Sequence, residues 1–126
     1  MTRRVLIVDD EADVNLQLKL ILESKGFEVD TFNDPLEALS NFKEGLYDLL
    51  IIDIRMPKMN GFELYLEIKK ICDKVKVCFL TALAELREYD VFKKRVFPKF
   101  GERHFAQKPI ENEELINQVN LILFSS

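Results

Sequence analysis

The sequence has few of the residues that mark specialised classes of chain. It contains two cysteines, four glycines, four prolines and one histidine among 126 residues. The low glycine and proline content excludes collagen-like repeats and argues against a disordered chain. Cys72 and Cys78 lie in or beside apolar runs and lack the paired spacing of a zinc site, so we expect neither a disulfide framework nor a structural metal.

Long apolar runs and an excess of positive charge are also missing. No stretch approaches the roughly 20 apolar residues that span a bilayer, and the N-terminus shows no signal-peptide cleavage pattern. The formal net charge is -4, which does not favour nonspecific binding to nucleic acid. No helix-turn-helix or other DNA-reading unit is visible. We therefore expect a cytoplasmic protein that binds neither membranes nor, directly, nucleic acid.

The residues that are present fit one globular domain. The chain is 48% hydrophobic and 32% charged, and its length is that of one ordinary domain. We expect a single domain over residues 1–126, with no output domain in this chain. Unless the chain is a fragment of something larger, its output then has to pass through protein contacts.

Short apolar runs alternate with helical patterns along the chain. Continuous apolar runs are typical of buried parallel strands. Strands are predicted at Val5 to Val8, Phe27 to Phe32, Leu49 to Ile52, Val75 to Leu80 and, more weakly, His104 to Gln107. Helices are predicted at Glu11 to Lys25, Leu36 to Glu44, Asn60 to Ile71, Ala84 to Val96 and Glu111 to Leu123. This alternation predicts an α/β fold with a central five-stranded parallel sheet covered by helices on both faces.

Polar side chains interrupt the apolar pattern where the predicted strands end. The segments concerned are Asp9-Asp10-Glu11, Asp53, Thr81 and Lys108-Pro109. In parallel sheets, ligands bind in the crevice at the carboxyl ends of the strands. Grouped carboxylates repel one another unless a cation neutralises them, and an all-oxygen set suits Mg²⁺. The sequence therefore predicts a magnesium site at this edge of the sheet.

Four motifs carry a resemblance to a known family. They are Val8-Asp9-Asp10-Glu11, then Asp53-Ile54-Arg55-Met56-Pro57 with Gly61 shortly after, then Leu80-Thr81-Ala82, and Lys108-Pro109. Together they resemble the response regulator receiver domains of two-component signal transduction, the CheY-like family. Each motif alone is a weak signal, but all four occur in order, at the ends of the appropriate strands. The resemblance covers nearly the whole chain and implies a doubly wound (βα)5 flavodoxin-like three-layer sandwich.

The resemblance implies a role for each residue of the site. Asp53 is expected to accept a phosphoryl group from the phosphohistidine of a sensor histidine kinase or phosphotransfer protein, or from a small donor. Mg²⁺ is expected on Asp9, Asp10, Asp53 and the backbone carbonyl of Arg55, with Asp9 acting through water. Lys108 is expected to contact the incoming phosphoryl group as a compact charge.

The resemblance also implies a switch that follows phosphorylation. Thr81 is expected to hydrogen-bond a phosphoryl oxygen, and Phe105 to rotate inward into the space that Thr81 leaves. The change would be read by an unknown protein target on the surface of the fourth helix, fifth strand and fifth helix. Homodimers through that surface are usual in the family, but the segment from Thr81 to Lys108 is longer than usual, which leaves this dimer open.

Two other functions stay open on the sequence alone. Magnesium-dependent phosphohydrolases also place aspartates at parallel-strand ends, although the first strand here lacks an Asp-x-Asp nucleophile pattern. A pseudo-receiver would bind partners without taking phosphate. We favour a signalling phosphoacceptor that catalyses only its own phosphorylation and dephosphorylation, since all five core site residues are present.

Overall fold

The computed structural model of the chain describes residues 2–82 and 104–124. Its strands are β1 (Arg4–Val8), β2 (Glu28–Phe32), β3 (Leu49–Asp53), β4 (Lys76–Thr81) and β5 (Phe105–Gln107). Its helices are α1 (Ala12–Glu23), α2 (Pro35–Asn41), α3 (Gly61–Ile71) and α5 (Asn112–Phe124). The helix predicted at Ala84 to Val96, and most of the lengthened segment that contains it, lie outside the described residues.

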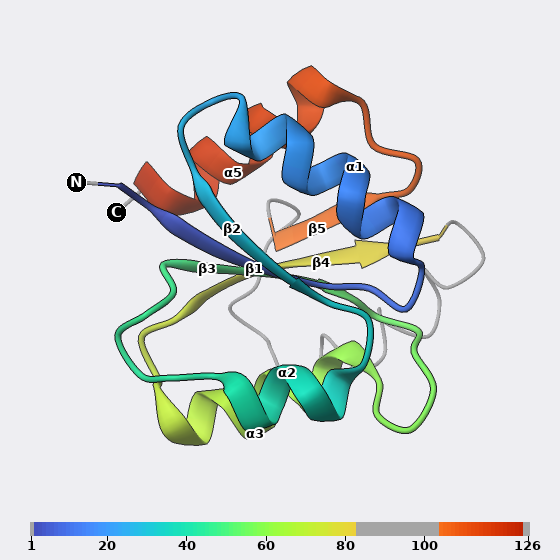
Figure 1. The fold of residues 1–126 in the computed structure, drawn as a ribbon, viewed down its shortest axis with the longest axis vertical. Helices are drawn as coiled ribbons and strands as arrows, with labels where there is room; N and C mark the ends of the chain where they lie inside the picture. Colours follow the sequence, from blue (N-terminus) through green and yellow to red (C-terminus); the bar gives the residue numbers. More distant parts are fainter. Residues whose placement is uncertain (1, 83–103, 125–126) are drawn as a thin grey trace.

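The strands form one parallel sheet in the order β2-β1-β3-β4-β5. Helices α1 and α5 lie on one face of this sheet, and α2 and α3 lie on the other (Figure 1). The chain runs outward from β1 to β2 and then returns to place β3 on the other side of β1. The doubly wound three-layer fold is therefore confirmed, and its topological switch point lies between β1 and β3.

The sheet separates two hydrophobic cores, because successive side chains of a strand point to opposite faces. The core beneath α1 and α5 contains the strand residues Val5, Ile7, Leu49, Ile51, Cys78 and Leu80. The core beneath α2 and α3 contains the alternate residues Leu6, Val8, Leu50, Ile52, Val77 and Phe79. Burial on both faces explains why these strands are continuous apolar runs in the sequence.

Two helices begin at a residue whose side chain caps the first turn. The Asp34 carboxylate accepts a hydrogen bond from the backbone N–H of Leu36 at 2.9 Å, and Pro35 occupies the first helical position of α2. At α3, the Asn60 side chain and Glu63 form a reciprocal capping box. These caps fix the entry of both helices on the side of the sheet that carries the polar strand ends.

The end predicted for α2 is wrong. The helix stops at Asn41, not at Glu44, and Phe42 has extended backbone geometry with ψ 135°. Extension directs Phe42 into the core, where its ring stacks on Tyr47 with centroids 5.8 Å apart. Gly45 follows with a positive φ of 82°, within the connecting turn and not at the helix end.

The sequence predicts an apolar face of α3 made of Phe62, Leu66, Ile68 and Ile71, and this prediction is partly wrong. Phe62 and Ile68 are buried and Leu66 is partly buried, but Ile71 is 42% exposed. Leu64 and Tyr65, which were not assigned to this face, are buried instead, and the Tyr65 ring packs against Phe79 edge to face.

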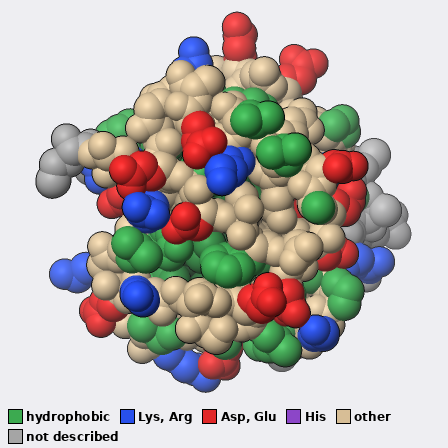
Figure 2. All heavy atoms as spheres, in the orientation of Figure 1, with side chains coloured by type: hydrophobic (Ala, Val, Ile, Leu, Met, Phe, Trp, Pro, Cys, Tyr) green, Lys and Arg blue, Asp and Glu red, His purple; other side chains and the backbone are tan. Residues whose placement is uncertain are grey.

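The surface shows charges of both signs intermixed with hydrophobic side chains over the face drawn in Figure 2. Within the part of the chain that the structure describes, no helix combines the length and the apolarity needed to cross a membrane.

Candidate functional site

Three carboxylates meet at the switch point of the sheet. Asp9 and Asp10 follow β1, and Asp53 is the last residue of β3, the neighbouring strand. One oxygen from each side chain lies within 4.8 Å of the others. Asp9 and Asp53 are buried, whereas Asp10 is exposed at the mouth of the site. The structure thus brings together the three side chains that the sequence predicts as metal ligands.

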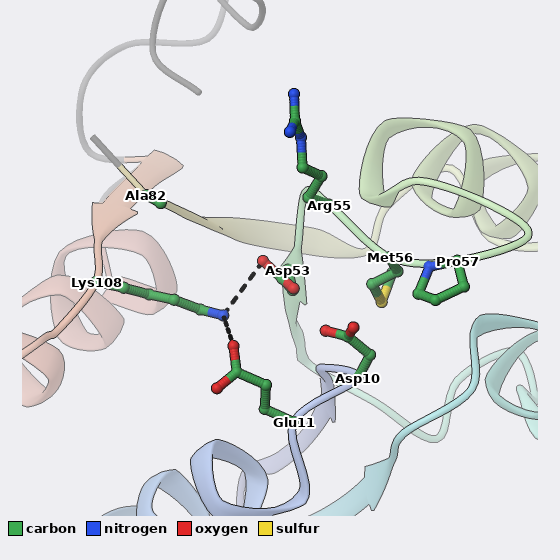
Figure 3. A pocket seen from close by; sticks show the side chains of 8 residues that line it. All are labelled: Asp10, Glu11, Asp53, Arg55, Met56, Pro57, Ala82 and Lys108. Atoms are coloured by element: carbon green, nitrogen blue, oxygen red, sulfur yellow. Dashed lines mark ion pairs between the residues drawn. The ribbon is translucent and has the colours of Figure 1, made fainter. Parts of the chain in front are cut away.

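Lys108 reaches this cluster from the segment that follows β5. Its Nζ lies 2.7 Å from Oδ2 of Asp9 and 3.4 Å from Oδ1 of Asp53. It also lies 3.8 Å from Oε1 of Glu11, which is largely exposed. Figure 3 shows the lysine pointing between Asp53 and Glu11. One ammonium group is therefore shared by three carboxylates.

The site is short of positive charge. Burial raises the pKa of Asp9 above its ordinary value, although Lys108 opposes the shift. Burial, together with the neighbouring charge on Asp9, raises the pKa of Asp53 well above the usual aspartate range. Desolvation lowers the pKa of Lys108, but its carboxylate partners outweigh that effect and raise it. One lysine does not neutralise the cluster, and a bound cation would favour the ionised carboxylates.

The carboxylates open into a crevice of about 390 Å³ that also exposes Met56, Pro57 and Ala82. Arg55 lines it as well, but its guanidinium points away from the acidic cluster (Figure 3). The crevice contains charged carboxylate oxygens and an ammonium group beside the apolar side chains of Met56, Pro57 and Ala82. It therefore suits a small hydrated cation and a phosphoryl group better than an apolar ligand.

Thr81 and Phe105 lie beside the cluster on neighbouring strands. Thr81 is buried at the end of β4, its hydroxyl donates to the carbonyl oxygen of Ala82 at 3.1 Å, and its own carbonyl accepts from the backbone N–H of Lys108. Phe105 is buried, and its ring stacks on Phe79 with centroids 5.6 Å apart. The two side chains predicted to form a switch therefore lie on adjacent strands, at the end of β4 and the start of β5.

Gly61 approaches the site from the first position of α3. A Cβ at this position would overlap the backbone carbonyl oxygen of Asp53 and lie 3.0 Å from Cγ2 of Ile52. The Gly61 N–H donates to the carbonyl oxygen of Ile54 at 2.8 Å. The sequence identified Gly61 as a motif residue, but only the structure shows that its missing side chain lets the helix touch β3.

Two residues of the site were not predicted. Glu11 was noted within the acidic motif without a role, and a strand-end position next to two aspartates was the available signal. Asn15 is buried in the first turns of α1 and donates to the carbonyl oxygen of Asp9 at 2.8 Å. Asparagine usually lies at the surface, and no sequence pattern marked this one.

The sequence can now be compared with known proteins. The profile of the response regulator receiver domain matches residues 5–120. The transcriptional regulatory protein CpxR homolog of Haemophilus influenzae is 38% identical over 121 residues, which are 95% of this chain and 50% of that protein. The chain spans about half the length of the curated relatives it matches.

Solved structures show the same fold. The non-phosphorylated HemR receiver domain from Leptospira biflexa has a TM-score of 0.83 at 26% identity, over 99% of this chain and 97% of that one. A CheY-like receiver domain protein from Methanospirillum hungatei has a TM-score of 0.78 at 28% identity, over 95% and 92% of the two chains. With the acidic cluster at the switch point and a profile match over most of its length, the chain belongs to the response regulator receiver domain family of two-component systems.

Proposed function

We propose that this receiver domain is a phosphoacceptor in which Asp53 takes a phosphoryl group. The observation that carries the proposal is the position of Asp53 at the end of β3, with Lys108 at 3.4 Å and oxygens of Asp9 and Asp10 within 4.8 Å of its own. Asp9, Asp10, Asp53 and the backbone carbonyl of Arg55 would hold Mg²⁺. The donor set fits this ion because it offers oxygen ligands and an open, hydrated side.

The chemistry requires little more than position and charge. An Asp53 carboxylate oxygen attacks the phosphorus, and the bond from phosphorus to the donor breaks, so that the leaving group keeps the electron pair. Bound Mg²⁺ would offset the negative charge of the phosphoryl oxygens. Lys108 is already aimed at Asp53 and can turn from the carboxylate to a phosphoryl oxygen. An ionised carboxylate needs no general base, which suits a site where no histidine is among the described lining residues.

The switch follows from the same arrangement. Once Asp53 carries the phosphoryl group, the Thr81 hydroxyl would leave the Ala82 carbonyl and donate to a phosphoryl oxygen. Phe105 already lies inward against Phe79, so it would hold that position in the active state. The donor would be the phosphohistidine of a sensor histidine kinase or phosphotransfer protein in the cytoplasm. The downstream partner would be a protein that binds the surface formed by β5 and α5.

Intact mass after incubation with Mg²⁺ and acetyl phosphate tests the proposal. We expect a single phosphoryl adduct that requires Mg²⁺ and is absent from Asp53→Asn, since the amide is not a nucleophile. Lys108→Ala should form the adduct at least tenfold more slowly, because it removes a charge that stabilises the transferring group.

Asp48→Asn is a matched control, since Asp48 is a carboxylate that precedes β3 and binds Arg4 at the opposite end of the strand. It should form the adduct at the wild-type rate. An adduct that persists in Asp53→Asn would contradict the assignment of the nucleophile. Release of inorganic phosphate from an added phosphomonoester would instead favour a phosphohydrolase.

A further inference from the structure

Asn15 is a buried polar residue that the phosphoacceptor chemistry does not use. It lies in α1 and is only 5% exposed. Its Nδ2 donates to two backbone carbonyl oxygens, that of Asp9 at 2.8 Å and that of Phe32 at 3.2 Å. Asp9 follows the last residue of β1, and Phe32 is the last residue of β2. The Asn15 amide group therefore joins α1 to the ends of two strands.

These hydrogen bonds act on the turn that carries the acidic pair. The backbone N–H of Asp9 also donates to the Phe32 carbonyl, at 3.2 Å. The Asp9 carboxylate accepts a hydrogen bond from the backbone N–H of Glu11 at 2.9 Å and forms an ion pair with Lys108. Asp9 is therefore held at its amide, its carbonyl and both carboxylate oxygens. The hydrogen bond to the carbonyl comes from Asn15.

The carbonyl of Asp9 determines the direction of Asp10. A peptide group is planar, so a hydrogen bond to the Asp9 oxygen also fixes the plane that contains the nitrogen of Asp10. Rotation of this peptide would move the Asp10 carboxylate relative to Asp53. Asp10 is exposed and needs such support more than the buried Asp9 and Asp53 do.

We infer that Asn15 is a positioning residue that fixes the Asp9–Asp10 peptide and thereby sets the affinity of the acidic site for Mg²⁺. The inference rests on the proposed function, in which Asp10 is a metal ligand. Mutation of residues that orient metal ligands through hydrogen bonds commonly weakens metal affinity by about 10- to 100-fold.

The geometry argues against a role in stability alone. The Oδ1 atom of Asn15 is buried without a hydrogen-bond partner among the described residues. A buried acceptor without a partner destabilises the fold, and this offsets part of what the two donated hydrogen bonds contribute. Leucine has a similar size and removes the buried Oδ1, but it leaves the Asp9 carbonyl oxygen without the donor at 2.8 Å, which lowers stability in its own right. Asn15→Leu should therefore lower the melting temperature somewhat while it releases the Asp9–Asp10 peptide, so the Mg²⁺ affinity has to be compared with that of a variant destabilised elsewhere in α1.

Titration with Mg²⁺ separates positioning from stability. For Asn15→Leu we expect the half-saturating Mg²⁺ concentration, measured by calorimetry, to rise about tenfold. The rate of adduct formation from acetyl phosphate at saturating Mg²⁺ should stay within about twofold of the wild type, because the ligands themselves remain. Leu22→Ala is the control, since Leu22 is fully buried at the far end of α1. It should lower the melting temperature and leave Mg²⁺ affinity unchanged.

Two outcomes would overturn the inference: Asn15→Leu binding Mg²⁺ as tightly as the wild type, or Leu22→Ala weakening it equally. A wild-type chain that binds Mg²⁺ but forms no adduct would contradict the phosphoacceptor chemistry alone, and the calorimetric comparison of the variants would still decide the role of Asn15. A wild-type chain that binds no Mg²⁺ would overturn both.

Discussion

Gly61 is a residue through which the start of α3 contacts β3, the strand that ends in Asp53. Its φ is not in the left-handed region, so its role is steric: an added Cβ would overlap the Asp53 carbonyl oxygen. Gly61→Ala should lower the free energy of unfolding by about 1 to 3 kcal/mol, as overpacked sites do. It should also slow adduct formation, because the helix or Asp53 has to move. Urea unfolding and intact mass measure the two effects.

Gly26 provides a control of the opposite kind. It has a positive φ of 92° and no heavy atom within 4 Å of an added Cβ. Gly26→Ala should cost about 1 kcal/mol through backbone strain and leave adduct formation at the wild-type rate. Equal rates for Gly61→Ala and the wild type would show that Asp53 tolerates the displacement.

At the level of single residues, the sequence predicts those that follow strands and fails for those that support them. Asp9, Asp10, Asp53 and Lys108 interrupt or follow apolar runs, so their common edge can be inferred from strand ends. Asn15 belongs to a helix, and its contacts with two strand ends depend on the packing of α1. The local sequence pattern does not reveal such contacts, because they form only when the helix packs against the sheet.

Among the elements, an ion pair joins the loop after β3 to the start of α2. Lys58 Nζ lies 3.0 Å from Oδ2 of Asp34, the residue that caps α2. The hydrogen bond from Lys58, with that from the Leu36 N–H, lowers the pKa of Asp34 below its ordinary value. Lys58 itself has a positive φ of 73°, an unfavourable conformation for a lysine that the ion pair helps to hold.

The lowered pKa of Asp34 determines how the contribution of the Lys58–Asp34 ion pair to stability depends on pH. Because the pKa of Asp34 is lower in the folded chain, its contribution to stability is present above the unfolded pKa of about 3.9 and is lost as pH falls through the folded value. Lys58→Met should therefore be less stable than the wild type at pH 7, with a difference that shrinks in acid. Urea unfolding at both pH values measures it. A difference that grows as pH falls would show that the ion pair is not its source.

The elements themselves were predicted with unequal success. All five strands were located to within one or two residues, because a strand buried on both faces is a continuous apolar run. The end of α2 was missed because Phe42 leaves the helix to stack on Tyr47, 5.8 Å away. The face of α3 was assigned partly to the wrong residues, since Leu64 and Tyr65 are as apolar as Ile71 and only packing distinguishes them.

For the whole molecule, binding of Mg²⁺ to the acidic cluster as proposed should couple stability to the ion. Without the ion, ionised Asp53 opposes folding, because burial and Asp9 raise its pKa. Asp53→Asn should therefore be more stable than the wild type in EDTA at pH 8. The difference should shrink as pH falls, since protonation removes the charge that the variant also lacks.

Saturating Mg²⁺ should narrow this difference. At about 100 times the dissociation constant, the wild type gains about 2.7 kcal/mol from binding alone. Asp53→Asn should gain less, because one ligand has lost its charge. Thermal unfolding of both proteins, with and without Mg²⁺, measures the change in the difference. A wild type more stable than the variant in EDTA at pH 8 would mean that Lys108 already compensates the cluster.

The order of the strands also distinguishes central strands, which are hydrogen-bonded on both sides, from edge strands, which are hydrogen-bonded on one side. Asp9 and Asp10 follow β1 and Asp53 ends β3, and both of these strands pair with strands on both sides. Lys108 instead follows β5, a strand of three residues with one neighbour among the described strands. Backbone amides at such an edge are the first to open to solvent exchange. In the proposed mechanism, a phosphoryl charge on Asp53 would act on Lys108 and thereby on β5, which would be the easiest of the described strands to displace.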